Sequence, residues 1–142
     1  MNYADVAEQI DARLRALPGL SAHYLGQWRK SVSVPCSVVP LPDIDYHQAY
    51  ANGMERVPEW EIAILAGGAD DIEAYRRLGR YASSSGEYSV RRVLESTDAE
   101  IFEPYTACHL VIVKSVTFDV ITWQNQDFQG ALFTLDVVGS GD

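Results

Sequence analysis

Hydrophobic residues near the start of the chain recur at intervals of three and four positions, with charged residues between them. The apolar positions are Tyr3, Val6, Ala7, Ile10, Leu14 and Leu17. This spacing predicts an amphipathic helix over residues 3–17, which Asn2 can cap and Pro18-Gly19 can end. Residues 20–35 have no firm period, and we expect a short strand there, followed by an extended polar loop.

The middle of the chain has the pattern of two strands joined by a turn. Residues 37–46 have strand character, but Pro40 and Pro42 remove amide donors and so confine this segment to a sheet edge or a bulge. Asn52-Gly53 predicts a turn, and the residues after it alternate as in a half-buried strand. We expect the two strands to form a hairpin. The alternation consists of Trp60, Ile62 and Ile64, with Glu61 and Ala63 between them.

Gly67-Gly68 stands before a second amphipathic pattern, where a phosphate-binding loop could form. The Lys-Ser/Thr pair and the glycine spacing of such loops do not occur, and the acidic residues at the helix start would repel phosphate. We therefore expect Asp70 to cap a helix and Glu73 to complete a capping-box-like pair. The predicted apolar stripe of this helix is Ala74, Tyr75, Leu78 and Tyr81, and its basic end carries Arg76, Arg77 and Arg80.

A polar corner follows at residues 83–95, where a serine run and Gly86 separate two helices. Gly86 can adopt the positive backbone torsion that ends a helix, and Ser89 can cap the next one. The corner has a structural role and carries no catalytic chemistry. The apolar stripe of the second helix, over residues 90–96, is formed by Val90, Val93 and Leu94.

The closing third of the chain carries the strongest strand pattern. Residues 106–123 are rich in Val, Ile, Thr and Phe, residues 124–127 form a polar break, and residues 128–138 resume the pattern. We expect a long C-terminal β-hairpin, which could reach about 60 Å if unbent and must therefore bend or project toward a neighbour. The whole pattern predicts an α+β fold, a mostly antiparallel sheet with two or three helices on one face. The core face of the last strand is predicted as Ala131, Phe133, Leu135 and Val137.

Length and charge narrow the class of protein. A chain of 142 residues is most economical as one domain, residues 1–142. No stretch approaches the roughly 20 apolar residues of a membrane span, so we expect no membrane association and use in a cytoplasm. The net charge of −9 disfavours tight DNA binding, because clustered Lys and Arg are needed to neutralise phosphates. Cys36 and Cys108 are expected to be buried free thiols.

Candidates for catalytic or metal chemistry are few. His23, His47 and His109 are scattered and supply none of the recurrent metal-ligand spacings. Asp43 and Asp45 could form a carboxylate pair, but the neighbouring prolines favour a solvated turn. No Gly-x-Ser-x-Gly nucleophile motif occurs. We therefore expect no catalytic residue, no cofactor and no metal.

Self-assembly is favoured instead by the predicted edge strand, the long hairpin and the aromatic residues near predicted loops. Residues 50–56 and 123–127 are the candidate contacts with other chains, because such loops can order when they meet a partner. The aromatic residues considered are Trp28, Tyr50, Trp60, Trp123 and Phe128, of which Trp60 and Phe128 are assigned to the core. The candidate interface residues are Tyr50, Met54, Arg56, Trp123, Gln124, Asn125, Gln126 and Asp127.

The order of these features resembles the tail terminator proteins of long-tailed bacteriophages with non-contractile, siphovirus-type tails. The resemblance extends over most of the chain. It implies a structural virion protein that closes the growing tail tube and joins the tail to the head. The matching segments are the opening helix with Leu17-Pro18-Gly19-Leu20, residues 46–56, the serine-rich corner, and residues 128–137.

The same resemblance implies the partners and the location. A ring of six copies at the head-tail interface of the virion, assembled in the host cytoplasm, would bind the major tail tube protein and the neck or stopper protein. DNA would pass through the lumen without tight binding. A ring needs two different patches on each subunit, for which we expect the strand 37–46 and the hairpin 106–138.

Two alternatives remain open. A neck or stopper protein would occupy the next ring toward the portal. A small cytoplasmic α+β enzyme or ligand-binding domain would be a different class of protein, which a monomer with a deep polar pocket would favour.

Overall fold

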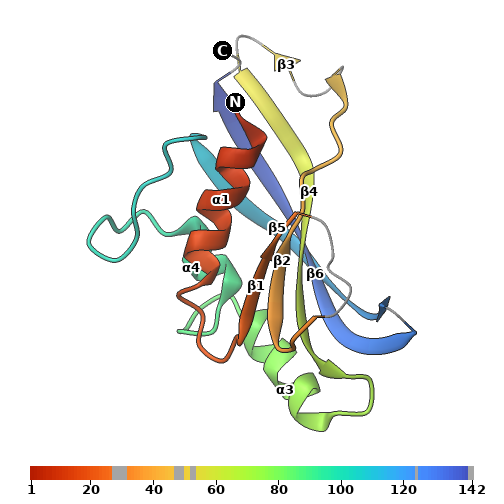
Figure 1. The fold of residues 1–142 in the computed structure, drawn as a ribbon. Helices are drawn as coiled ribbons and strands as arrows, with labels where there is room; N and C mark the ends of the chain where they lie inside the picture. Colours follow the sequence, from red (N-terminus) through yellow and green to blue (C-terminus); the bar gives the residue numbers. More distant parts are fainter. Residues whose placement is uncertain (27–31, 47–49, 52–53, 124, 141–142) are drawn as a thin grey trace.

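The chain folds into one twisted sheet with helices packed on one of its faces (Figure 1). The computed structural model describes residues 1–26, 32–46, 50–51, 54–123 and 125–140. The arrangement confirms the predicted α+β class. In chain order the elements are α1 (Tyr3–Leu14), β1 (Ala22–Leu25), β2 (Cys36–Val39), β3 (Tyr50–Ala51), β4 (Met54–Gly68), α3 (Ile72–Tyr81), α4 (Val90–Glu95), β5 (Leu110–Trp123) and β6 (Gln126–Ser140).

The sheet has the strand order β1-β2-β4-β6-β5, and β3 pairs with the start of β4. β1 and β2 run parallel, and the other pairings of the described strands are antiparallel. The two central strands, β4 and β6, have 15 residues each, with Ile62 opposite Phe133. β1 and β5 are therefore the outer strands of the path.

The prediction of an edge strand over residues 37–46 is wrong. β2 ends at Val39, immediately before Pro40, and lies inside the sheet between β1 and β4. Its expected antiparallel pairing with the long strand that follows is confirmed, with Cys36 opposite Leu65. The prolines end the strand without exposing its side, because β1 covers that side through a parallel pairing that the sequence pattern does not reveal.

The first helix, α1, is shorter than the range of residues 3–17 that its apolar pattern predicts. The Asn2 side chain accepts hydrogen bonds from the backbone N–H groups of Ala4 and Asp5 at 3.0 and 3.2 Å, which confirms the predicted cap. α1 ends at Leu14, and a tighter turn follows in which the Leu17 N–H donates to the Leu14 carbonyl at 3.0 Å. Leu17 is still buried, so the apolar pattern identified a core residue beyond the end of the helix.

The principal core lies between the sheet and helices α1, α3 and α4. Alternate residues of β4 and β6 face this core, and the predicted core face of β6 is confirmed. None of the helices within the described residues is long and apolar enough to cross a membrane. The largest side chains that the core buries completely or nearly so are Trp60, Tyr81, Phe133, Ile10, Leu14, Ile62 and Ile64.

The polar corner between α3 and α4 is confirmed. Gly86 has a φ of 96°, in the left-handed region that favours glycine. The Ser89 hydroxyl accepts a hydrogen bond from the Arg92 N–H at 3.1 Å and donates to the Ser83 carbonyl, so it caps α4 and ties it to the end of α3. The apolar stripe of α4 is buried as predicted.

Helix α3 differs from its prediction at two positions. Asp71 caps it instead of Asp70, with a side-chain oxygen that accepts from the Glu73 N–H at 2.9 Å. Tyr75, which the helical spacing assigns to the core, is 67% exposed. The apolar stripe of α3 is therefore narrower than predicted, because only Ala74, Leu78 and Tyr81 of this helix are buried in the core.

The long C-terminal hairpin is confirmed, with a tighter turn than expected. β5 pairs with β6 along its length, from Leu110 opposite Val138 to Trp123 opposite Gln126. Asn125, in the turn, has a φ of 60°, a conformation that asparagine tolerates better than most residues. Gln126 and Asp127 therefore belong to a strand and not to a loop.

A second apolar cluster lies on the other face of the sheet, where Cys36 packs beside Phe128 and Leu65. Cys108 lies in the principal core, so both cysteines are buried free thiols as predicted. Burial raises the pKa of each thiol to about 11.

Both thiols are expected to react slowly with a water-soluble thiol reagent in the folded protein. Their raised pKa lowers the thiolate fraction near pH 8 by about 100-fold relative to an exposed cysteine, and burial restricts access further. Unfolding in denaturant should bring both to the rate of free cysteine. Rapid labelling of either thiol in the folded protein would contradict this packing.

Candidate functional site

The two predicted contact segments lie at opposite ends of the sheet (Figure 1). Residues 54–56 begin β4 beside the end of β6, whereas residues 125–127 lie at the turn where β6 begins. The 15 residues of β6 separate them by about 50 Å if that strand is fully extended. The structure therefore gives two separate surfaces and not one site.

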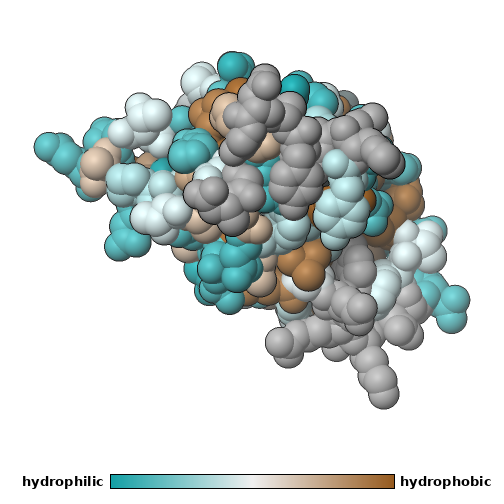
Figure 2. Space-filling model, turned by 90° about the horizontal axis from the view of Figure 1, so that it is seen from above, coloured by the Kyte–Doolittle hydropathy of each residue, from teal (hydrophilic) through white to brown (hydrophobic). Residues whose placement is uncertain are grey.

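Residues 50–51 and 54–56 of the first segment lie in paired strands, so the prediction of a flexible loop is wrong for these residues. Tyr50 lies opposite Glu55 in the β3–β4 pair. The predicted turn residues Asn52-Gly53 lie outside the described residues, as does Trp28. Met54 is exposed, and the hydrophobic residues coloured at this end of the molecule form small separate patches (Figure 2).

Arg56 already has a partner in the sheet. Its Nε and Nη2 atoms donate to the two carboxylate oxygens of Asp136 at 2.9 and 2.7 Å, and this pairing raises the pKa of Arg56. The neighbouring Glu55 is buried and accepts from the amino group of Met1 at 3.0 Å. Arg56 thus fixes β4 to β6.

The second segment forms a polar tip on an aromatic base, as predicted. Asn125, Gln126 and Asp127 are exposed, and the Asp127 carboxylate accepts from the Thr122 hydroxyl at 2.6 Å. Trp123 is half-buried against the second apolar cluster. Gln124 lies outside the described residues.

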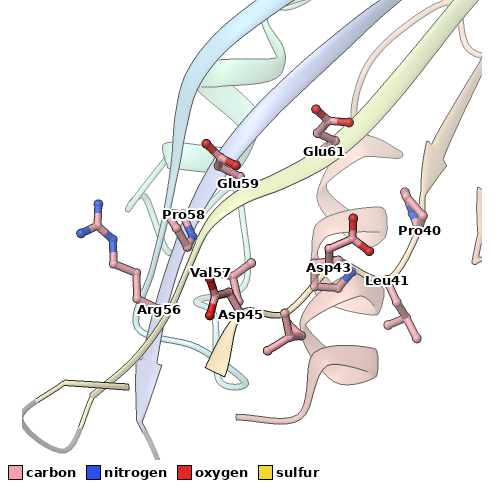
Figure 3. Close-up of a pocket in the computed structure, with 11 residues that line it drawn as sticks. Pro40, Leu41, Asp43, Asp45, Arg56, Val57, Pro58, Glu59 and Glu61 are labelled. Carbon is pink, nitrogen blue, oxygen red and sulfur yellow. The ribbon is translucent and has the colours of Figure 1, made fainter. Parts of the chain in front are cut away.

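An acidic hollow of about 620 Å³ lies between β4 and the loop that follows β2. Figure 3 shows Asp43 and Asp45 on the loop and Glu59 and Glu61 on β4, with Arg56 pointing away from them. Asp43 and Asp45 are exposed, as expected of a solvated turn. We call this surface, with the exposed Leu41 beside it, the acidic hollow.

The chemistry of the acidic hollow suits cationic side chains. Within the described part of the chain, no group of three or more His, Cys, Asp or Glu residues is placed to hold a metal ion. The loop is held in place by Trp60, whose Nε1 donates to the Pro40 carbonyl at 2.9 Å. Four carboxylates on an ordered rim can therefore attract a basic partner surface without first being ordered.

An apolar groove of about 610 Å³ lies between α3 and the sheet at the far end of β5. Tyr75 from α3 and Phe118 and Val120 from β5 form its walls, and these side chains are 67%, 55% and 53% exposed. Gly79 leaves open space beside them, because a Cβ atom there would meet nothing within 4 Å. We call this surface the α3–β5 groove.

The wall of the α3–β5 groove is anchored by Gln129. Its side-chain amide donates to the carbonyls of Gly68, Ala69 and Asp71 at 3.1, 3.0 and 2.8 Å, which ties the start of α3 to β6. Arg76 lies in the groove and pairs with Glu73 at 2.8 Å. Five of the eleven basic residues of this acidic protein lie on α3 and α4, namely Arg76, Arg77, Arg80, Arg91 and Arg92.

Sequence reasoning did not identify the α3–β5 groove. Helical spacing assigned Tyr75 to the core, and strand alternation could not show that Phe118 and Val120 extend past the part of the sheet that the core covers. The length of the predicted hairpin is the sequence feature that could have indicated this groove. The hairpin is longer than a domain of this size is wide, so part of it is expected to extend beyond the core.

The histidines have no shared site in the described residues. His23 Nδ1 lies 2.8 Å from the Ser37 hydroxyl, and burial is the main cause of its lowered pKa. His109 is exposed before the start of β5, and its backbone N–H donates to the Val138 carbonyl at 2.8 Å. His47 lies outside the described residues.

Comparison of the chain with protein families, with curated proteins and with solved structures gives no match.

Proposed function

We propose that this chain is a structural subunit of a bacteriophage virion that closes the tail tube as a ring of copies. One face of the ring would bind the last ring of the major tail tube protein and stop its polymerisation. The other face would receive the neck or stopper protein of the head. The resemblance of the ordered sequence features suggests this role, with six copies in the ring.

The observation that carries the proposal is the outer strand β5. It has 14 residues, and among the described strands β6 is its one neighbour. Its exposed large hydrophobic side chains are Leu110, Ile112, Phe118 and Val120. Long outer strands with apolar side chains promote pairing with other chains, and soluble proteins usually shorten, charge or cover them. An assembly partner that covers β5 accounts for this surface.

Ring formation also requires two different patches on each subunit. The strand 37–46 cannot be one of them as predicted, because β2 lies inside the sheet. The loop after β2 is still at the surface, at the acidic hollow, while the hairpin supplies the α3–β5 groove. The acidic hollow and the α3–β5 groove therefore take the place of the strand 37–46 and the hairpin 106–138 as the two proposed patches.

The net charge of −9 fits passage of DNA through such a ring. A mostly acidic lumen repels phosphates and so lets DNA pass without sticking. Duplex DNA should accordingly bind the isolated protein more weakly than micromolar even at low salt.

The proposal is tested by an early stop codon in the gene of the phage that encodes this chain. We expect tail tubes of uncontrolled length and heads without joined tails, and supplying the intact chain in trans should restore both. Normal infectious particles without the chain would overturn the proposal. Tails of normal length that do not join heads would assign the chain to the neck or stopper position instead.

A further inference from the structure

We propose that, in the free protein, the outer edge of β5 pairs with the same edge of a second copy of this chain, antiparallel and with Phe118 opposite its own counterpart. The inference goes beyond the proposed ring and does not depend on it. A contact of this kind is two-fold and joins the copies in pairs, so each pair has to separate before its members join a ring.

Two side-chain hydrogen bonds identify the backbone groups that face the outer edge of β5. The Val120 N–H donates to the carboxylate of its neighbour Asp119 at 2.8 Å, so it points away from β6. The pairing with β6 has no register shift after Ser115. Because groups on one side of a strand recur at every second residue, the backbone N–H and C=O groups of Val116 and Phe118 face the same edge. These groups are in position to bond a further strand.

The second of these bonds limits the open part of the edge. The carboxylate of Glu95, on α4, accepts from the Val113 N–H at 3.0 Å, so a side chain already occupies the edge at this position. At the other end, β5 ends at Trp123. The open stretch is therefore residues 114–122, and Phe118 is its middle residue. An antiparallel pairing that uses the whole stretch in both copies places Phe118 opposite itself.

The side chains are complementary in this register. Thr117 of each copy lies opposite Asp119 of the other, so that each hydroxyl can donate to a carboxylate that is exposed in the single chain. Val116 lies opposite Val120, and the two Phe118 rings meet at the two-fold axis. Phe118 and Val120 are 55% and 53% exposed in the single chain. A shift by two residues toward the turn would place the two Asp119 carboxylates opposite each other, which is destabilising.

The pairing protects the free protein. An open strand edge with apolar side chains is a template for aggregation, and proteins cover such edges. The second copy covers the open stretch of β5 with backbone hydrogen bonds and with apolar side chains. The edge then becomes available to other partners only when the pair separates.

Disulfide cross-linking tests the register. Phe118→Cys places two cysteines opposite each other with their Cα atoms about 5.5 Å apart, a separation that a disulfide spans. Val120→Cys is the matched control, because Val120 is similarly exposed on the same face but would lie about 13 Å along the strand from its counterpart. In a glutathione redox buffer, with Cys36 and Cys108 buried, we expect at least about tenfold more covalent dimer from Phe118→Cys than from Val120→Cys.

Sedimentation of variants without added cysteines tests the side-chain pairs. Thr117→Asp places a carboxylate opposite Asp119 at both pairs and should raise the dissociation constant of the dimer about tenfold. Thr117→Lys changes the same exposed position but places a cation opposite Asp119, so its dimer should be at least as tight as that of the native chain. Circular dichroism shows that both variants keep the fold.

Three results would each overturn the inference. They are a native chain that stays monomeric up to its solubility limit, equal cross-linking of the two cysteine variants, and equal dissociation constants of the two Thr117 variants. Rings of the free protein without the cross-link at position 118 would overturn it as well and leave the proposed function standing. Dimers that cross-link at position 118, formed by a chain that phage tails do not need, would support this inference and remove the proposed function.

Discussion

Replacement of Arg13 with alanine is expected to lower the free energy of unfolding by about 3–5 kcal/mol, a large share of the stability of a marginally stable domain. Arg13 is 6% exposed and lies in α1. Its guanidinium donates to three backbone carbonyls, those of Val93 at 3.1 Å, Ser96 at 2.8 Å and Glu103 at 2.9 Å.

Aromatic rings complete this site. The guanidinium carbon lies 4.0 Å from the ring centre of Tyr105 and 5.3 Å from that of Phe102. Alanine would remove the cation from both rings, leave the three carbonyls without their donor and open a cavity. Arg13 therefore joins the end of α4 and the residues that follow it, up to residue 103, to the first helix.

Urea unfolding followed by circular dichroism measures this effect. Arg13→Lys should fall between the native protein and Arg13→Ala, because lysine keeps the charge but lacks the planar guanidinium. Arg76→Ala is the control, since Arg76 and its partner Glu73 are both mostly exposed and the loss of this pair should cost under about 1 kcal/mol. Equal stability of Arg13→Ala and Arg76→Ala would show that the anchoring by Arg13 is unimportant.

Truncation of Trp60 to alanine should cost about 3–5 kcal/mol, because it empties a fully buried position at the centre of the core. The ring also packs edge-on against Tyr3, with ring centres 6.3 Å apart. Trp60→Phe is the informative variant. It keeps most of the apolar volume but removes the donor to the Pro40 carbonyl, so the cost should be about 1–3 kcal/mol.

Urea unfolding also measures these two costs. Trp123→Phe is the control, because Trp123 is half-buried on the other face of the sheet. Equal stability of Trp60→Phe and Trp123→Phe would show that the hydrogen bond to the Pro40 carbonyl contributes little.

The parts of the fold predicted correctly are those with local causes. The Asn2 cap, the Gly86 turn and the Ser89 cap depend on side chains acting within a few residues of themselves. The core face of β6 follows from strict alternation along one strand. These features can be predicted from the local sequence because they do not depend on residues that are distant in the chain.

The parts predicted wrongly depend on which distant segments meet. Residues 37–39 are predicted at an edge, but the short strand β1 pairs with them in parallel, and the sequence between β1 and β2 has no clear pattern that predicts this pairing. Tyr75 follows helical spacing, yet the core does not extend over its position. The acidic hollow and the α3–β5 groove likewise combine segments that are far apart in sequence, so the local pattern does not predict them.

Cryo-electron microscopy of the intact virion, at the junction of tail and head, tests the proposed closed ring. We expect one ring of six copies of this chain between the last tail tube ring and the neck. A single copy, an open chain, or no density for this protein at the junction would refute the proposed ring.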